Sequence, residues 1–191
     1  EWLSDKSMIN FDQVQSNSLD YATDYPWDMD KRTITDDELV RRDSWQSKFM
    51  PSGAFVAGRV DNTHWLSFGT PDILPILYSK QPVLMTSNSA EAIIRIGSIE
   101  PNNGSEIKQL NWSTIPANHD IKVRMSGLVW PEASERIANS AYLTREQIGN
   151  GQLILFSGQP NFRGSTRGTS RLWLNAVVYG AGLGTTPRIN L

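Results

Sequence analysis

The two histidines are the first residues to test for metal chemistry. A hydrolytic zinc site built from a His, a nearby Glu and a later His leaves one coordination position open for water. His64 and His119 are the only histidines of the 191-residue chain, and the positions three residues later hold Ser67 and Lys122 rather than Glu. The sequence therefore predicts no metal site, and we expect each histidine to lie on a loop surface.

Catalytic nucleophiles are equally scarce. The chain has no cysteine, which excludes thiolate nucleophiles, thiolate metal sites and disulfides. The Gly-x-Ser-x-Gly elbow of serine hydrolases and the Gly-x-x-x-x-Gly-Lys phosphate loop do not occur in the sequence. A Ser–His–Asp triad assembles in space, so the sequence leaves it open, but no local signature supports one. The sequence predicts no catalytic residue.

The best-placed candidate site is the loop that follows the apolar run 153–156. Gln159, Asn161, Arg163 and Arg167 come after this run, and the two arginines stand at the start of an expected helix. Backbone N–H groups at a helix start favour anions, so a small anion or a carboxylate can bind there. In the alternative, which we favour, the arginines pair with acidic residues of preceding loops and cap carbonyl groups.

An acidic and aromatic arm covers residues 20–38. Asp28-Met29-Asp30 begins like a calcium-binding loop, but the central Gly and the closing Glu of such a loop are missing. Three aromatic residues of the arm, Tyr21, Tyr25 and Trp27, can stack on a sugar or can pin a long loop onto a core. A solvated structural loop is the favoured interpretation.

The surrounding sequence predicts strands and helices in an α/β fold with an open, largely parallel sheet. The continuous apolar run 153–156 is typical of a strand covered on both faces, and the last helix is apolar on most sides, which predicts burial. We therefore expect Leu155 and Leu174 in the core. The expected strands are 54–60, 72–78 (an edge or interrupted strand because of Pro75), 82–85, 92–96, 121–125, 142–144 and 153–156. The expected helices are 36–45 with Asp36 as its cap, 132–140 with Pro131 at its start, and a last helix that Ser165 or Thr166 caps and that runs through Tyr179.

Composition narrows the classes of partner. The formal net charge is −2 and no polybasic stretch occurs, so nucleic acid is not expected as a partner. No apolar segment is long enough to predict a membrane span. The chain opens at Glu1 without an initiator Met and shows no signal peptide. We therefore expect a mature product or a fragment, and an export signal could have preceded Glu1 in the original protein.

Three segments carry a family resemblance. The strongest is 151–164, continued by Thr166-Arg167-Gly168-Thr169 and Leu172-Trp173-Leu174-Asn175-Ala176; Gly53–Asp61 with His64–Gly69, and Leu128–Ala141, also contribute. Together they resemble the C-terminal domain of large bacterial zinc carboxypeptidase-like proteins, a domain similar to class I glutamine amidotransferases. The resemblance covers roughly residues 50–180 and is strongest over 150–178.

The resemblance implies a division of the chain and a role for it. It implies an N-terminal helix and irregular arm (1–49), a flavodoxin-like or amidotransferase-like α/β domain (50–180) with a β-rich insertion, and a tail (181–191). The domain would be a non-catalytic accessory to the upstream peptidase domain of an exported, periplasmic or secreted protein, with zinc held by the peptidase domain and no cofactor in this chain. The alternatives are a module that binds a small anion, carboxylate or sugar acid through the loop after the last strand and, less favoured, a free-standing hydrolase. Amidotransferases use a Cys–His–Glu triad, which a chain without cysteine cannot form. The resemblance also implies that the first strands of the family's sheet precede Glu1 or come from another chain.

Overall fold

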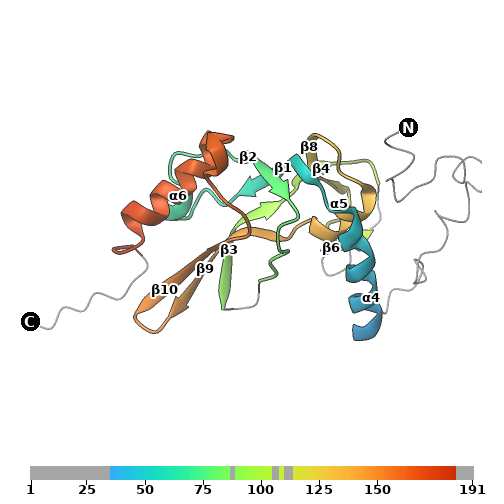
Figure 1. The fold of residues 1–191 in the computed structure, drawn as a ribbon, viewed down its shortest axis with the longest axis horizontal. Coiled ribbons are helices and arrows are strands. Elements are labelled where there is room, and N and C mark those ends of the chain that lie inside the picture. Colours follow the sequence, from blue (N-terminus) through green and yellow to red (C-terminus); the bar gives the residue numbers. More distant parts are fainter. Residues whose placement is uncertain (1–34, 87–88, 105–107, 110–113, 184–191) are drawn as a thin grey trace, which may run out of the picture. The chain divides into compact units, whose positions relative to one another are not determined.

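The computed structural model describes residues 35–86, 89–104, 108–109 and 114–183 (Figure 1). The chain divides into two compact units, Glu1–Ser44 and Trp45–Leu191. Asp28-Met29-Asp30 and the aromatic residues of the arm lie outside the described residues. The described elements are α4 (Asp36–Gln46), η1 (Ser47–Phe49), β1 (Ser52–Val60), η2 (Trp65–Ser67), β2 (Ile73–Ser79), β3 (Ala90–Ile96), β4 (Ser98–Pro101), β5 (Lys108–Gln109), β6 (Thr114–Ile115), β7 (His119–Lys122), β8 (Arg124–Ser126), α5 (Pro131–Ile137), β9 (Ala141–Ile148), β10 (Gly151–Phe156), η3 (Phe162–Gly164) and α6 (Arg167–Tyr179).

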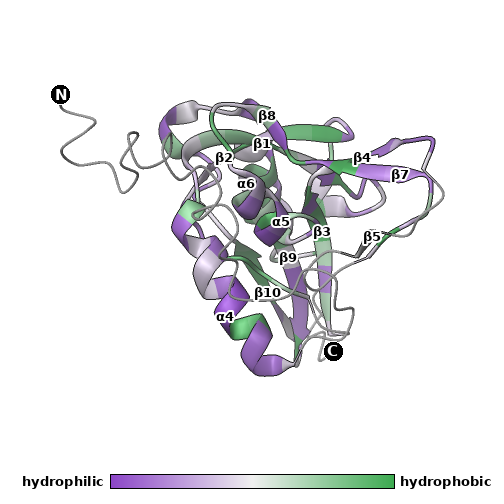
Figure 2. Cartoon of the chain, turned by 90° about the vertical axis from the view of Figure 1, so that its right-hand side faces the viewer, coloured by the Kyte–Doolittle hydropathy of each residue, from purple (hydrophilic) through white to green (hydrophobic). Residues whose placement is uncertain are grey.

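Helix α4 begins with a reciprocal cap one residue earlier than predicted. The backbone N–H of Glu38 donates to the Thr35 hydroxyl (3.3 Å), and the Thr35 N–H donates to the Glu38 carboxylate (3.1 Å). Thr35 and Glu38 thus form a capping box, whereas Asp36 is the first helical residue rather than the cap. Figure 2 shows α4 as mainly hydrophilic, with Val40 an exposed exception.

The main sheet has six strands and is antiparallel. Its order is β10-β9-β3-β1-β2, with β8 also paired to β1, and the sheet curls like half a barrel. Every strand pairing among the described residues is antiparallel, including the small pairs β4–β7 and β5–β6. Strand β2, which contains Pro75, lies at one edge of the sheet, as the proline predicts.

The predicted open, largely parallel, flavodoxin-like sheet is therefore wrong. Parallel neighbours need a crossover of a dozen or more residues, usually a helix, whereas short connections bring strands back antiparallel. Only Gly149 and Asn150 separate β9 from β10, and Gly149 has the positive φ (56°) that a tight hairpin turn requires. The run 153–156 thus belongs to a hairpin and not to a buried parallel strand.

The core lies between the sheet and its helices. Its fully buried side chains include Val56, Leu74, Ile76, Ile94 and Leu172, of which Leu172 comes from α6. Gly58 in β1 lies where an added Cβ would overlap the Ile76 side chain, so the absence of a side chain there lets β1 and β2 carry their apolar residues close together.

The last strand and the last helix are less buried than predicted. Strand β10 is an edge strand whose Leu155 is 43% exposed, and Leu174 of α6 is 44% exposed. Both residues were expected in the core, and both expectations are wrong. Leu155 shares the exposed face of β10 with Leu153, whereas Ile154 and Phe156 on the other face are half-buried. Helix α6 buries the side that carries Thr169, Leu172 and Asn175. Helix α6 is therefore amphipathic in its packing although its sequence is apolar on most sides.

The predicted strand 121–125 is divided between two sheets. Strand β7 pairs with β4, whereas β8 pairs with β1. Val123 lies between them, is 2% exposed, and accepts a hydrogen bond at its carbonyl from the Ala57 N–H (2.8 Å). The predicted strand 82–85 is reduced to a single bridge between Leu84 and Ala141. Within the described part of the chain, no helix combines the length and the apolar character that crossing a membrane requires.

Candidate functional site

The loop between β10 and α6 places the four predicted ligand-binding residues at the surface. Gln159, Asn161, Arg163 and Arg167 are all exposed. The Arg163 backbone is left-handed (φ 49°), and its guanidinium lies 5.2 Å from the centre of the Phe162 ring. Because β10 is the edge strand of an antiparallel sheet, this loop does not lie at the carboxyl edge of a parallel sheet, where ligands of α/β proteins bind.

Two threonines anchor this loop to the start of α6. Thr166 is the N-cap residue and is buried, and its hydroxyl meets that of Thr169. The Thr169 hydroxyl also donates to the carbonyl of Pro160. Between these anchors, no carboxylate of the described residues forms an ion pair with Arg163 or Arg167. The favoured alternative, in which the two arginines pair with acidic residues of preceding loops, thus finds no such acidic residue in the described part of the chain.

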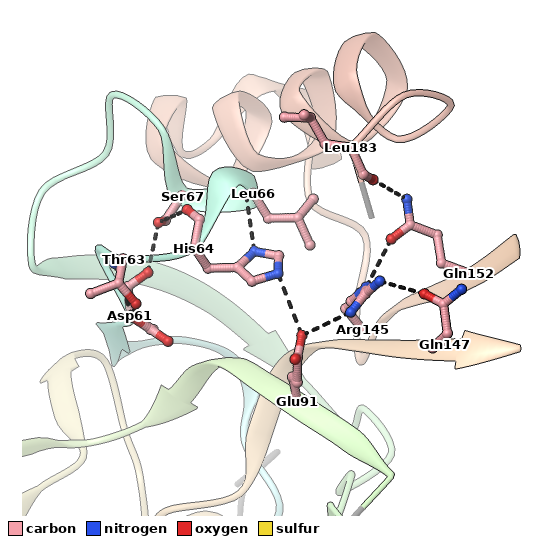
Figure 3. Close-up of polar contacts among 10 residues, drawn as sticks. All are labelled: Asp61, Thr63, His64, Leu66, Ser67, Glu91, Arg145, Gln147, Gln152 and Leu183. Carbon is pink, nitrogen blue, oxygen red and sulfur yellow. Dashed lines mark hydrogen bonds and ion pairs between the residues drawn. The ribbon is translucent and has the colours of Figure 1, made fainter. Parts of the chain in front are cut away.

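A polar cluster lies on the sheet beneath η2 and the end of α6 (Figure 3). Arg145 of β9 is its centre: its guanidinium donates to Glu91 (3.3 Å), Gln147 (2.6 Å) and Gln152 (2.9 Å). Gln152 in turn donates to the carbonyls of Gly180 (2.6 Å) and Leu183 (2.7 Å). The cluster therefore joins β3, β9 and β10 to the C-terminal end of α6.

His64 joins this cluster from the N-terminus of η2. Its Nδ1 accepts a hydrogen bond from the Leu66 N–H (3.1 Å), and its Nε2 lies 3.6 Å from the Glu91 carboxylate (Figure 3). Since Nδ1 is an acceptor, the neutral ring carries its proton on Nε2, facing Glu91. His64 lies in the loop between β1 and η2, as predicted, but its side chain is only 15% exposed, so the prediction of a surface position is wrong.

The surroundings of His64 favour its neutral form. Burial lowers the pKa of His64 most, and the Arg145 charge lowers it further, against the raising effects of Glu91 and Asp61. Protonation at Nδ1 would also set two donors, the ring N–H and the Leu66 N–H, against each other. His64 therefore caps η2 and has no free nitrogen with which to act as a general base.

The remaining parts of a Ser–His–Asp triad do not assemble around His64. The Ser67 hydroxyl donates to the backbone carbonyls of Asp61 and His64 (2.6 Å each), not to the imidazole. The Asp61 carboxylate accepts from the N–H and hydroxyl of Thr63, and these bonds lower the Asp61 pKa. The side chains of Asp61, His64 and Ser67 therefore stabilise the turn between β1 and η2.

His119 lies apart from this cluster, at the start of β7. It is half-buried, and its Nδ1 lies 2.9 Å from the Ala117 carbonyl. It is therefore a strand residue and not the loop-surface residue that was predicted. Within the described segments, no group of three or more His, Asp or Glu side chains is placed to hold a metal ion.

Helix α6 presents an apolar surface that the sequence analysis missed. Four apolar side chains of its outer face are 44–59% exposed, Trp173, Leu174, Val177 and Val178, and they lie beside the exposed Arg167 and Arg171. Asn175 holds the opposite side in place, since its amide donates to the carbonyls of Leu66 (2.8 Å) and Phe68 (2.9 Å) in and after η2. A buried Asn within an apolar run was the available signal that α6 has one inner and one outer side.

Helix α6 packs against the rest of its unit through its inner side only. Figure 1 shows α6 along one flank of the sheet, and the helix packs against η2 and β2 through its inner side. Scattered exposed apolar residues are normal, but a contiguous apolar patch marks an interaction surface. Comparison of the chain with protein-family models, with curated proteins and with solved structures gave no match.

Proposed function

We propose that this chain is a non-catalytic accessory domain that binds a neighbouring protein domain through the outer face of α6. The observation that carries the proposal is the row of Trp173, Leu174, Val177 and Val178, each close to half exposed on a helix whose inner side is fully packed. Large aromatic and aliphatic side chains of this kind are the anchors of protein interfaces.

The chemistry of the described residues supports a binding role over a catalytic one. His64 uses Nδ1 to cap η2 and directs Nε2–H toward Glu91. Ser67 and Asp61 are engaged with backbone groups and with Thr63. These groups, which are the natural candidates for acid–base or nucleophilic chemistry, stabilise the fold instead.

The partner we propose is a carboxypeptidase A-type zinc peptidase domain of the same exported bacterial protein, periplasmic or secreted. Support comes from the segment that carries the family resemblance, Leu172-Trp173-Leu174-Asn175-Ala176. Internal packing explains Leu172 and Asn175, which are buried. It does not explain Trp173 and Leu174, which point outward. The zinc of this proposal belongs to the peptidase domain, and the antiparallel sheet gives no support to the amidotransferase-like part of the resemblance.

A second candidate function is the binding of a small anion or carboxylate, such as a sugar acid, by Gln159, Asn161, Arg163 and Arg167. The observation in its favour is that both guanidinium groups are exposed and form no ion pair with the described carboxylates. A site of this kind would raise the thermal midpoint with citrate or sulfate, and Arg163→Ala would abolish the rise. If no anion shifts the midpoint, this candidate fails.

The test of the accessory role starts from the gene that encodes the chain. We expect a His-x-x-Glu and a later His upstream, within a peptidase domain that can be produced separately and titrated with this chain by calorimetry. The double variant Leu174→Lys/Val177→Lys keeps a good helix former at both positions but would place charge in the interface. Covering two half-exposed side chains contributes about 2 kcal/mol, so binding should weaken at least ~30-fold.

Leu128→Lys is the matched control, because Leu128 is 67% exposed and precedes α5 rather than lying on α6. It should bind like the wild type. Two results would refute the proposal: an upstream domain that does not bind, or a double variant that binds as tightly as the control. Release of C-terminal residues from peptides, or of ammonia from glutamine, by the isolated chain at on the order of 10 per second would refute its non-catalytic character.

A further inference from the structure

Two arginines face each other across neighbouring strands of the main sheet. Arg59 of β1 and Arg95 of β3 are register partners in an antiparallel pair, and both are half-buried. Side chains at directly opposite positions lie on the same face of a sheet, and like charges at such positions are destabilising. The pair therefore needs a compensating interaction.

Among the described residues, only uncharged groups accept hydrogen bonds from the two guanidinium groups. Arg59 donates to the Gly97 carbonyl (3.3 Å) and to the Asn139 side-chain oxygen (2.9 Å). Arg95 donates to the Asn139 carbonyl (3.2 Å) and to the Thr86 hydroxyl (3.1 Å). No carboxylate in the described segments forms an ion pair with either guanidinium. Burial lowers the pKa of both arginines, and the charge of Arg95 lowers that of Arg59 further.

Asn139 fixes the position of both guanidinium groups. It lies between α5 and β9 with a left-handed backbone (φ 59°), and its N–H donates to the Ile96 carbonyl (2.8 Å). Because its side chain holds Arg59 and its carbonyl holds Arg95, the two cations converge on one residue. A guanidinium carries five N–H donors, and two are used on each arginine, so several donors remain for a ligand.

We propose that Arg59 and Arg95 bind an oxyanion, the carboxylate or phosphate group of a small ligand, between their guanidinium groups. Paired, pre-positioned guanidinium forks match the geometry of carboxylate and phosphate oxygens. An anion there would also neutralise the repulsion that no carboxylate of the described residues compensates. This site is independent of the outer face of α6 and of the loop that contains Arg163 and Arg167.

The test measures thermal unfolding of the whole chain in phosphate and in citrate, against chloride at equal ionic strength. We expect the midpoint to rise with the logarithm of the phosphate or citrate concentration above the dissociation constant. A rise in phosphate alone identifies a phosphate-type ligand, and a rise in citrate alone identifies a carboxylate. Isothermal calorimetry with the same anions gives the affinity directly.

Three variants assign the site. Arg95→Lys keeps the charge but loses the planar fork, and should weaken anion binding about tenfold; Arg95→Gln should abolish the midpoint rise without lowering the midpoint in chloride. The double variant Arg163→Gln/Arg167→Gln is the control and should respond like the wild type. The proposal is overturned if neither anion raises the wild-type midpoint above chloride. It is also overturned if the rise survives in both Arg95 variants or is lost in the control.

Discussion

Leu172 and Leu174 provide a direct test of which side of α6 stabilises the domain. Both are leucines in the same helix, two positions apart, yet Leu172 is 0% exposed and Leu174 is 44% exposed. Leu172 belongs to the core cluster that also contains Leu66 and Leu74. Changing each leucine to alanine separates the buried contribution of the helix from its exposed one.

The magnitudes follow from burial. Leu→Ala removes three carbons, worth about 0.8 kcal/mol each when fully buried, and leaves a cavity when the site cannot collapse. Leu172→Ala should therefore lower the free energy of unfolding by about 3 kcal/mol. At Leu174 roughly half of the transfer contribution applies and no cavity forms, which gives about 1 kcal/mol, reduced further by the higher helix propensity of alanine.

Urea denaturation followed by circular dichroism and tryptophan fluorescence measures both values, provided that the slope with denaturant stays constant across the variants. Leu155→Ala is the control in the edge strand, and with 43% exposure it should behave like Leu174→Ala. Equal losses at positions 172 and 174, or a larger loss at 174, would mean that α6 packs through the side assigned here as its outer face.

Two further predictions concern titratable groups. Because the pKa of His64 is lowered in the folded state, the stability it contributes is present above the ordinary histidine pKa of about 6.5 and is lost as pH falls through the lowered value. The side-chain oxygen of His64→Asn can still accept from the Leu66 N–H, so this variant should lose the acid dependence, while His64→Ala should cost about 1 kcal/mol at neutral pH. Urea denaturation from pH 8 to 5 measures both, and a loss of stability at acid pH that is unchanged in His64→Asn would contradict the role given to His64. Burial raises the pKa of Tyr78 to about 12, and its hydroxyl is buried without a hydrogen-bond partner among the described residues. Tyr78→Phe should therefore leave the free energy of unfolding unchanged or raise it by up to about 1 kcal/mol. A loss of more than about 1 kcal/mol would show that the hydroxyl has a partner.

Local patterns in the sequence predicted most elements correctly. Pro75 identified β2 as an edge strand, Pro131 marked the start of α5, and Thr166, one of the two residues predicted to cap the last helix, is its N-cap. These signals are local, since a proline or a cap residue acts on the backbone within one turn. Strand direction is not local, and the apolar run 153–156 reads the same in a parallel strand as in a hairpin.

The sequence did not predict which side chains are buried or how neighbouring strands are aligned. Trp173 and Leu174 are apolar whether a helix is covered by its own domain or by another one, so their exposure is invisible in the sequence. The opposition of Arg59 and Arg95 depends on the register between β1 and β3, which tertiary packing sets. His64 has no sequence neighbour that identifies it as a cap bonded to β3, because Glu91 approaches it only in the folded sheet.

The hydrogen bond from Asn175 to Leu66 spans 109 residues of sequence, and this separation has a kinetic consequence. Folding slows as native contacts become more distant along the chain, because loop-closure entropy must be paid before such contacts form. During synthesis the carbonyls of Leu66 and Phe68, and the core residues that pack with Leu172, stay without these partners until α6 has left the ribosome. Nascent chains shorter than residue 175 are therefore expected to be the aggregation-prone species, and completion of the last helix is the step that ends this exposure.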